Sequence, residues 1–446
     1  MGKLFGTDGI RGIAGKYPVD IETGKRLGYF LVNFCKARGK STYIITGRDT
    51  RESGEILEKA VSAGILAAGG TVRSAGVIPT PGVAFLTKKE GCGAGVVISA
   101  SHNPFDYNGF KLFSGDGYKF SEAEENEIEN KILDKTVELS IPDLESLTSL
   151  PDSKDYYTAF LKNIVHDKEK LKEYSIVVDC SNGAASVVAP DLINDLGVKA
   201  DIIFSAPDGK NINANCGSQH TESLSKRVIE KSADIGLAFD GDADRLIAVD
   251  EKGTALTGDQ IIAICTKMLH ERNELKNDVV VTTVMSNMGL GAALKEMGVR
   301  HEKTGVGDRL VMEKMRETGS SVGGEDSGHI IFANNHTTGD GMLSALQLLN
   351  AMVFSGKPLS KLSGIMKIYP QVLINVQVKS KPEISEVPEI KEAIEASEAA
   401  LGENGRILVR YSGTEPLCRV MVEGKVQSEI EKKAKDIAEI IERELN

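Results

Sequence analysis

Apolar residues along this chain follow two alternating patterns. Short apolar runs such as Thr42–Thr46 precede longer stretches such as Gly54–Ala68, in which apolar residues recur at helical spacing. Strands that alternate with helices favour layered α/β domains over all-α or all-β domains. The first predicted series is strand Thr42–Thr46, helix Gly54–Ala68, strand Thr71–Ala75, a helix after Pro81, and strand Gly95–Ile98.

The same series of elements recurs further along the chain. A second copy runs from strand Ser175–Asp179 to strand Gly236–Phe239, and a third runs from strand Val279–Thr283 to Gly323–Gly324. Each copy ends in a polar loop. Such a repeat predicts three related α/β domains with mixed sheets, whose loops converge on one central cleft.

The last part of the chain differs from these repeats. Gln371–Val378 alternates like a half-buried strand, and strands Arg406–Arg410 and Leu417–Val422 follow the helix Pro388–Leu401. Together with the amphipathic helix Ser428–Leu445 they predict a smaller α+β C-terminal domain. Turn and helix-breaking residues place the four predicted domains at 1–151, 152–252, 253–368 and 369–446.

Four polar loops carry the candidate chemistry. They supply a serine on a rigid turn, three closely spaced aspartates, a glutamate behind two glycines, and an arginine among small hydroxyl residues. Together these groups describe phosphoryl transfer on a polar, phosphorylated substrate. The loops are Val96–Pro104, Asp240–Arg245, Gly324–His329 and Arg410–Pro416.

Ser101 is the candidate nucleophile. A serine hydroxyl is a weak nucleophile, and it needs a base, a metal or a good leaving group. His102 follows directly, but the chain has no G-x-S-x-G elbow, so an esterase triad is poorly supported. An isolated serine in a turn is more often a surface residue, and the three companion loops are what favour a catalytic role here.

Asp240, Asp242 and Asp244 are the candidate metal ligands. We expect them to alternate along an extended segment with their carboxylates on one side, where hard oxygen ligands suit Mg²⁺. An EF-hand is excluded because Arg245 stands where that loop requires glycine. The alternative is an acidic turn that binds no metal. Arg245 itself would most simply reach a phosphate.

Glu325 follows two glycines that allow the backbone to approach a ligand closely. Its carboxylate can accept hydrogen bonds from two adjacent sugar hydroxyls, and Ser327 can add a further contact. His329 either moves a proton or orients the loop. A solvated turn is the alternative for this segment.

The fourth loop, which contains Arg410, Ser412, Gly413 and Thr414, joins two predicted strands. Hydroxyl groups, exposed backbone N–H groups and an arginine fork are what a phosphate monoester requires. No G-x-x-x-x-G-K-[ST] motif occurs, so ATP is not implied. Three further cations lie near predicted loop ends: Arg11, Arg48 and Lys111. Each of them on its own is more typical of a surface charge.

Bulk composition limits the classes of partner. The formal net charge of −11 argues against nucleic acid as the main partner, but a small phosphorylated substrate needs only local cations. The six scattered cysteines indicate reduced, mostly buried thiols and no zinc site. No apolar run approaches the ~18 residues that span a bilayer, and the N-terminus has no signal core. We expect a cytoplasmic protein that binds neither nucleic acid nor membrane; its oligomeric state stays open.

Taken together and in this order, the four loops resemble those of the α-D-phosphohexomutase superfamily over the whole length of the chain. Three further motifs, Gly6–Gly12, Val306–Arg309 and His336–Met342, bring it nearest to the members that act on hexosamine phosphates. Asp326 and Gly305 depart from the pattern usual in that group.

The resemblance implies a resting enzyme that carries phosphate on Ser101, with one Mg²⁺ held by that phosphoserine and the three aspartates. Transfer to a hexosamine 6-phosphate would give a 1,6-bisphosphate, which turns around in the cleft and also serves as activator. The C-terminal domain, on one hinge, would act as a lid.

The resemblance also assigns roles to individual residues. Arg245 and Lys111 would assist the transfer, Glu325 and Ser327 would hold the sugar, and the fourth loop would hold the phosphate that is not reacting. The candidate catalytic residues are Ser101, His102, Lys111, Arg245, Arg11 and His329.

Three alternatives stay open. The same chemistry on a mannose or glucose phosphate is the nearest, because the sequence does not decide the C2 substituent. A phosphatase would let water attack the Ser101 phosphate, and a sugar-phosphate sensor would need neither the serine nor the three aspartates.

Overall fold

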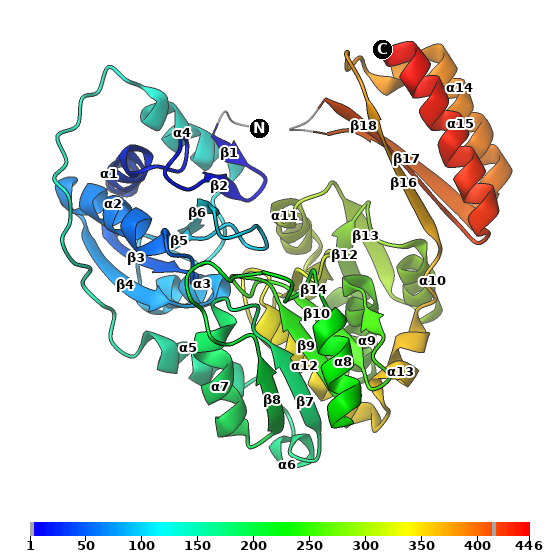
Figure 1. The fold of residues 1–446 in the computed structure, drawn as a ribbon, viewed down its shortest axis with the longest axis horizontal. Coiled ribbons are helices and arrows are strands. Elements are labelled where there is room, and N and C mark those ends of the chain that lie inside the picture. Colours follow the sequence, from blue (N-terminus) through cyan, green and yellow to red (C-terminus); the bar gives the residue numbers. More distant parts are fainter. Residues whose placement is uncertain (1–3, 413–415) are drawn as a thin grey trace. The chain divides into compact units, whose positions relative to one another are not determined.

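The computed structural model describes residues 4–412 and 416–446, which fall into two compact units. Unit 1 comprises Met1–Ser286 and Met297–Ile365, and unit 2 comprises Asn287–Glu296 and Met366–Asn446. Figure 1 labels most of the helices and strands of the two units.

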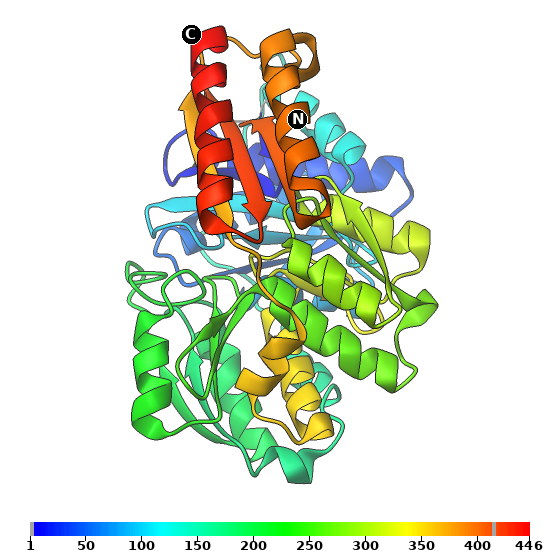
Figure 2. The ribbon, with the colours of Figure 1, turned by 90° about the vertical axis from the view of Figure 1, so that its right-hand side faces the viewer.

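Unit 2 is built on a three-stranded antiparallel sheet in the order β16-β18-β17. Two long helices pack on this sheet, and their apolar residues join those of the strands in one core (Figure 2). This α+β arrangement confirms the predicted C-terminal fold. The elements are β16 (Gln371–Gln377), α14 (Pro388–Leu401), β17 (Gly405–Tyr411), β18 (Leu417–Gly424), α15 (Gln427–Leu445), and the 3₁₀ turns Ile384–Glu386 and Gly402–Asn404.

A short helix from elsewhere in the sequence also belongs to unit 2. Helix α10 (Met288–Glu296) begins where the Met288 backbone N–H donates to Glu423 Oε1 at 2.7 Å. The Asn287 side chain bonds both backbone groups of Tyr369, donating to its carbonyl at 2.9 Å and accepting from its N–H at 3.0 Å. Unit 2 is therefore assembled from two separate stretches of chain.

The first sheet of unit 1 has six strands in the order β1-β2-β6-β5-β3-β4. Strand β3 pairs in parallel with β4 and β5, whereas β5 pairs antiparallel with β6. The strands are β1 (Phe5–Gly6), β2 (Gly9–Ile13), β3 (Tyr43–Arg48), β4 (Thr71–Val77), β5 (Ala94–Ile98) and β6 (Tyr107–Ser114).

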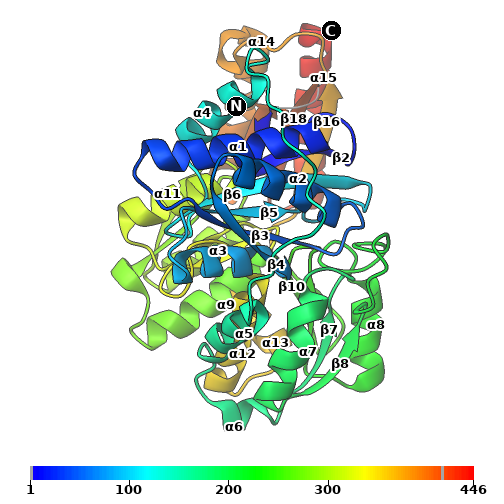
Figure 3. The ribbon, with the colours of Figure 1, turned by 90° about the vertical axis from the view of Figure 1, so that its left-hand side faces the viewer.

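Helices cover both faces of this sheet (Figure 3). Neighbouring residues of β3 point in opposite directions: the Thr46 hydroxyl donates to Glu58 of α2 at 2.6 Å, while a Cβ on Gly47 would meet Val83 of α3 at 2.6 Å. Helices α1 and α2 cross so closely that a Cβ on Gly28 would lie 2.0 Å from the Val61 carbonyl oxygen. The helices are α1 (Ile21–Ala37), α2 (Gly54–Ala67), α3 (Thr80–Lys89), α4 (Glu122–Leu133) and α5 (Ser153–Lys162).

The second and third sheets repeat the design of the first. Their orders are β11-β10-β9-β7-β8 and β13-β12-β14-β15. Strand β9 pairs in parallel with β7 and antiparallel with β10, and β14 does the same with β12 and β15. The strands are β7 (Ser175–Asp179), β8 (Lys199–Ile203), β9 (Ile235–Phe239), β10 (Leu246–Asp250), β11 (Ala255–Leu256), β12 (Val279–Thr283), β13 (Arg300–Thr304), β14 (Val322–Gly324) and β15 (Ile330–Phe332).

One connection recurs in all three sheets. In each sheet, a polar loop follows a strand that pairs in parallel with one neighbour, and it leads into the next strand, which pairs antiparallel with that strand on its other side. These connections are β5-β6, β9-β10 and β14-β15. The predicted repeat of three α/β modules with mixed sheets is thereby confirmed.

Helix α12 (Gly341–Ser355) is the most buried helix of unit 1. It is apolar on nearly all sides and packs against α9 (Gly258–Glu271), β10 and β15, which ties the second and third sheets together. Among residues 4–412 and 416–446, no helix is both long and apolar enough to cross a bilayer. The other helical segments are α6 (Lys168–Leu171), α7 (Ala185–Leu196), α8 (Glu222–Lys231), α11 (Asp308–Thr318), α13 (Leu359–Leu362), and the 3₁₀ turns Lys276–Asp278 and Ser363–Ile365.

Candidate active site

Ser101 stands at the turn that follows β5, in the left-handed backbone region with φ 52°. Its backbone N–H donates to Ser99 Oγ at 2.9 Å, and its hydroxyl donates to Asp240 Oδ2 at 2.6 Å. The side chain is fully buried. The loops after β5 and β9 therefore meet at the serine hydroxyl.

His102 lies beside this hydroxyl, with Nδ1 3.3 Å from Ser101 Oγ. Burial lowers the pKa of His102 to about 4, with further lowering from the charges of Arg245 and Arg11. The imidazole is thus neutral near pH 7 and can accept a hydrogen bond or a proton.

Three buried carboxylates gather next to the serine. The ligand atoms of Asp240, Asp242 and Asp244 all lie within 4.8 Å of one another. The segment is a turn, with Ala243 at φ 57°, so the expected extended segment is wrong, although the carboxylates still converge. Burial and the charges of Asp244 and Asp242 raise the pKa of Asp240 well above its ordinary value.

This carboxylate cluster fits a divalent cation. Asp242 Oδ1 and Asp244 Oδ1 are buried and have no hydrogen-bond partner in the described part of the chain. Buried polar atoms normally have a partner, and hard oxygen donors in such a group suit Mg²⁺. A bound cation would satisfy both oxygens and offset the repulsion among the three charges.

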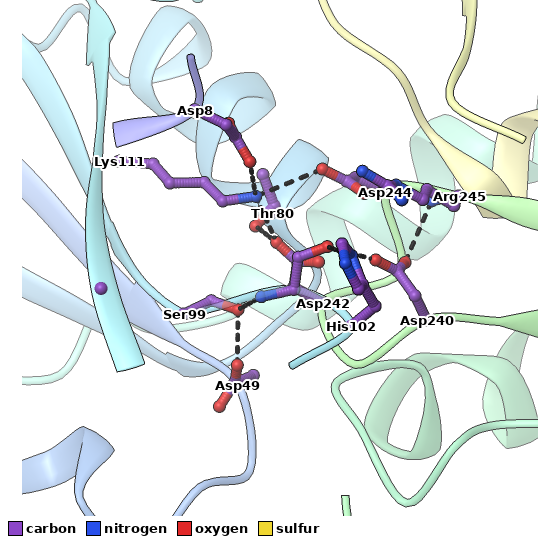
Figure 4. A network of polar contacts seen from close by, with 12 residues as sticks. Asp8, Asp49, Thr80, Ser99, His102, Lys111, Asp240, Asp242, Asp244 and Arg245 are labelled. Carbon is purple, nitrogen blue, oxygen red and sulfur yellow. Dashed lines mark hydrogen bonds and ion pairs between the residues drawn. The ribbon is translucent and has the colours of Figure 1, made fainter. Parts of the chain in front are cut away.

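Lys111 lies within strand β6, in the middle of the site rather than at the loop end that its position in the sequence had indicated. Its Nζ is 2.8 Å from Asp242, 3.3 Å from Asp244 and 3.0 Å from Asp8 (Figure 4). Burial disfavours the ammonium, but these carboxylates outweigh it and raise the pKa of Lys111 well above its ordinary value. Lys111 is therefore a fixed positive charge.

Two arginines complete this side of the site. Arg11, within β2, forms an ion pair with Asp8. Arg245 donates its backbone N–H to Asp240 Oδ1 at 3.1 Å, and its guanidinium Nε lies 3.8 Å from Asp244 Oδ1. Arg48, by contrast, pairs with Glu58 at 2.7 Å.

A chain of alternating charges leads from this cluster to the third loop. Lys119 contacts Asp8 and Asp308, and Asp308 Oδ2 lies 3.3 Å from His329 Nε2. His329 Nδ1 lies 3.6 Å from Asp244 Oδ2. The orientation of the imidazole is fixed by these two carboxylates and by the Gly339 backbone N–H, which donates to Nε2 at 3.2 Å. Although burial opposes it, Asp244 and Asp308 raise the pKa of His329.

The sequence interpretation missed Asp8, Lys119 and Asp308 as site residues. Asp8 and Asp308 both lie in glycine-containing motifs, Gly6–Gly12 and Val306–Arg309, which had served only to support the resemblance. A charged residue inside such a motif was the signal that could have identified them.

The third loop presents Glu325 and Ser327 beside this network. Glu325 Oε1 accepts from the Gly307 backbone N–H at 3.1 Å, and Ser327 is exposed. Asp326 turns the other way, because its Oδ1 accepts from the Asp259 backbone N–H at 3.3 Å, in the first turn of α9. The residue that departs from the usual pattern is thus engaged at a helix N-terminus.

In unit 2, Arg410 of β17 stands directly opposite Arg419 of β18. Partial burial, together with the charge of Arg419, lowers the pKa of Arg410. Like charges placed opposite each other on a sheet repel, and an anion bound between them would relieve that repulsion. Arg419 was not among the predicted residues.

The loop that follows Arg410 is described only at its ends. Ser412 donates its backbone N–H to the Leu417 carbonyl at 2.8 Å, and its own carbonyl accepts from Lys381 Nζ at 2.7 Å. Gly413 and Thr414 lie outside the described residues.

Unit 1 thus brings its predicted residues into one continuous network. They reach it from three separate loops and two strands of the first sheet. The residues are Ser101, His102, Lys111, Arg11, Asp240, Asp242, Asp244, Arg245 and His329, with Glu325 and Ser327 alongside.

The sequence matches four domain families in order. They are described as phosphoglucomutase/phosphomannomutase alpha/beta/alpha domain I at residues 2–138, domain II at 154–253 and domain III at 257–369, and as the C-terminal domain at 373–440.

Several curated proteins are similar over nearly the whole chain. The phosphoglucosamine mutase of Syntrophobacter fumaroxidans is 51% identical, with 99% of each chain covered. That of Desulforapulum autotrophicum is 52% identical, with 95% of each chain covered.

Solved structures share the fold at lower identity. A phosphoglucomutase/phosphomannomutase family protein from Burkholderia thailandensis has a TM-score of 0.82 at 24% identity, covering 99% of this chain and 98% of that one. The N-acetylphosphoglucosamine mutase of Aspergillus fumigatus, solved in complex with GlcNAc-6P and magnesium, has a TM-score of 0.70 at 17% identity, covering 99% and 95%.

Proposed function

This chain belongs to the phosphoglucomutase/phosphomannomutase family, and on that basis we propose that it interconverts glucosamine 6-phosphate and glucosamine 1-phosphate. The observation that carries the proposal is the buried Ser101 hydroxyl, bonded to Asp240 at the edge of a three-aspartate cluster. Relatives about half identical over the full chain, all named phosphoglucosamine mutase, support the choice of sugar.

Ser101 is the proposed phosphoryl carrier. In the forward step the Ser101 Oγ–P bond breaks and a bond from phosphorus to a sugar hydroxyl oxygen forms. The sugar hydroxyl loses its proton, and Ser101 Oγ takes up a proton to regenerate the serine hydroxyl. The resulting 1,6-bisphosphate then returns its other phosphate to Ser101. A hexose 1,6-bisphosphate therefore also serves as activator for enzyme that has lost its phosphate.

Asp240, Asp242 and Asp244 would hold one Mg²⁺ together with the phosphate on Ser101. When bound, the ion supplies Lewis-acid charge that stabilises the transferring phosphoryl group. The chain provides the orphaned carboxylate oxygens that would hold it.

The fixed cations of unit 1 stabilise the negative charge that spreads over the phosphoryl oxygens during transfer. Lys111 and Arg245 reach this region from β6 and from the aspartate loop, and Arg11 reaches it from β2. His102, neutral and beside Ser101 Oγ, is placed to accept a proton, whereas the carboxylates on either side of His329 suit it to orient the third loop.

Substrate contacts are assigned to the two remaining loops. Glu325 and Ser327 hold the sugar hydroxyls, and Arg410, Ser412, Gly413 and Thr414 hold the phosphate that is not reacting. We also infer four domains with boundaries near 151, 252 and 368, each of which supplies one loop.

The test is a mutase assay with Mg²⁺ and a trace of hexose 1,6-bisphosphate, in which glucosamine, mannose and glucose phosphates are offered separately. The expected result is the highest kcat/KM for the glucosamine pair. A preference for mannose or glucose would overturn the sugar assignment and leave the chemistry in place.

Two variants test the nucleophile. Ser101→Ala should lose turnover by at least about 10⁴-fold, because the covalent carrier is gone. Ser41→Ala, at an exposed loop serine, is the control and should keep wild-type rates. Release of inorganic phosphate in place of isomerisation would indicate a phosphatase.

A further inference from the structure

The backbone of the proposed nucleophile is held in an unusual conformation. A residue with a side chain rarely adopts the left-handed region, and Ser101 does so at φ 52°. Such a conformation persists only when surrounding contacts impose it.

Two side chains from different parts of unit 1 donate hydrogen bonds to the same two carbonyl groups. Arg51 Nη2 donates to the carbonyl oxygens of Ser101 at 3.0 Å and Asn103 at 2.6 Å. Asn213 Nδ2 donates to the same two oxygens, at 3.0 Å each. With Ser99 Oγ on the Ser101 N–H, both backbone polar groups of the nucleophile are fixed.

The two donors differ in how they are supported. Arg51 is buried and forms an ion pair with Asp49, which also accepts from the Ser99 hydroxyl (Figure 4). Asn213 lies in the irregular segment between β8 and α8, at φ 59°, and its backbone N–H donates to the Ser181 carbonyl at 2.9 Å. Arg51 comes from the first module and Asn213 from the second.

The aspartate loop, Asp240–Arg245, packs against the Ser101 carbonyl and the Asn213 amide. A Cβ on Gly241 would lie 2.6 Å from the Ser101 carbonyl oxygen and 2.8 Å from Asn213 Nδ2. No side chain fits there, so the nucleophile turn, the Asn213 amide and the aspartate loop are packed into direct contact.

We propose that Asn213 is a positioning residue for phosphoryl transfer, which clamps the Ser101–Asn103 turn together with Arg51 so that the serine hydroxyl stays directed at Asp240. The inference rests on the proposed role of Ser101 as phosphoryl carrier. Asn213 bonds the backbone of this turn, whereas the Ser101 hydroxyl bonds Asp240. It acts by coupling the nucleophile turn to the module that carries the aspartates.

The clamp matters for rate because transfer requires an in-line arrangement of oxygen, phosphorus and acceptor. A displacement of about 1 Å in such an arrangement can lower the rate about 100-fold. Loss of the Asn213 amide leaves Arg51 as the sole side-chain donor to both carbonyls among the residues described, and allows the strained turn to relax. The chemical step should slow, while the sugar-binding groups are unchanged.

The experiment compares Asn213→Gly with Asn215→Gly. Both asparagines lie in the same segment in left-handed conformation, with φ 59° and 53°, so glycine removes each side chain without backbone strain. Asn215 is exposed, and among the described residues its side chain makes no hydrogen bond to the turn, which makes it the matched control. Two quantities are measured: steady-state kcat and KM, and the rapid-quench rate of phosphoryl uptake by dephosphorylated Ser101 from hexose 1,6-bisphosphate.

Asn213→Gly should lower kcat and the uptake rate by about 10-fold to 100-fold with KM within about twofold, while Asn215→Gly keeps wild-type values. Asn213→Asp, which has the same shape but no donor, should be impaired at least as much. Thermal melting of each variant separates this effect from unfolding.

Equal uptake rates for Asn213→Gly and Asn215→Gly would overturn the clamp while the proposed function stands. A change confined to KM would do the same, since it would place Asn213 in substrate binding. Wild-type protein that takes up no phosphoryl group on Ser101 would overturn the proposed function and the clamp together.

Discussion

Replacing Lys111 with methionine should raise the affinity of the site for Mg²⁺. Lys111 Nζ lies 2.8 Å from Asp242 and 3.3 Å from Asp244. A cation bound by these two carboxylates would therefore lie close to the lysine ammonium and be repelled by it. Two unit charges about 4 Å apart interact by about 4 kcal/mol at an effective dielectric constant near 20. If only a quarter of that repulsion is relieved, about 1 kcal/mol, the dissociation constant falls about fivefold.

The same substitution should destabilise the protein when no divalent ion is present. Removing one partner from a buried ion-pair cluster costs about 3–5 kcal/mol, because the remaining charges stay buried without compensation. Methionine keeps the length and bulk of the lysine side chain, so the change is mainly one of charge.

The assay is thermal melting over a Mg²⁺ titration, with EDTA as the starting point. Comparison in a Ser101→Ala background keeps phosphate occupancy the same in all samples. Lys119→Met is the matched control, since Lys119 is also enclosed by carboxylates, those of Asp8 and Asp308, but within the described part of the chain it forms no ion pair with the three aspartates. Lys111→Met should melt lower than its parent in EDTA and gain more from Mg²⁺, whereas Lys119→Met should gain as much as the parent.

A gain from Mg²⁺ in Lys111→Met no larger than in the parent would refute this reasoning. It would mean that the lysine and the metal do not share the Asp242 and Asp244 carboxylates, and that Mg²⁺ binds elsewhere.

Three further predictions follow from single contacts. Asp242→Asn should weaken Mg²⁺ activation by at least about tenfold in the mutase assay, because one anionic ligand is lost; unchanged Mg²⁺ dependence would argue against the aspartate site. Burial raises the pKa of Asp179 to about 6, so the folded state binds this proton more tightly than the unfolded state. The stability of wild type relative to Asp179→Asn should therefore be greatest below about pH 4 and fall by up to about 1.4 kcal/mol per pH unit until about pH 6, as measured by denaturation across that range. Gly328→Ala should destabilise more than Gly298→Ala in melting experiments: both have positive φ, at 89° and 73°, but only at Gly328 would a Cβ meet a backbone atom, the Leu246 carbonyl oxygen at 2.2 Å.

The regular elements were accessible to sequence analysis because burial leaves a clear pattern. Strands β5, β9 and β12 are mostly apolar and buried at every position, and the loops that follow the first two contain the predicted serine and aspartates. Both the fold class and the order of the modules follow from such runs, since a strand buried on both faces has no polar alternation.

The contacts that complete the site depend on distant parts of the chain. Asn213 bonds Ser101 across 112 positions, and Lys119 meets Asp308 across 189. No local pattern encodes such a pairing. The turn at Ala243, φ 57°, was equally hidden, because alanine carries no signal for the left-handed region that glycine would give.

The division of the chain into units has a consequence for how the protein can be dissected genetically. Because α10 belongs to unit 2 while the chain on both sides of it belongs to unit 1, the polypeptide passes between the units three times. A fragment that begins at Met366 would leave Glu423 and Tyr369 without Asn287 and Met288. A contiguous C-terminal clone is therefore expected to express poorly, and the workable piece is a fusion that joins residues 287–296 by a flexible linker to residues 366–446.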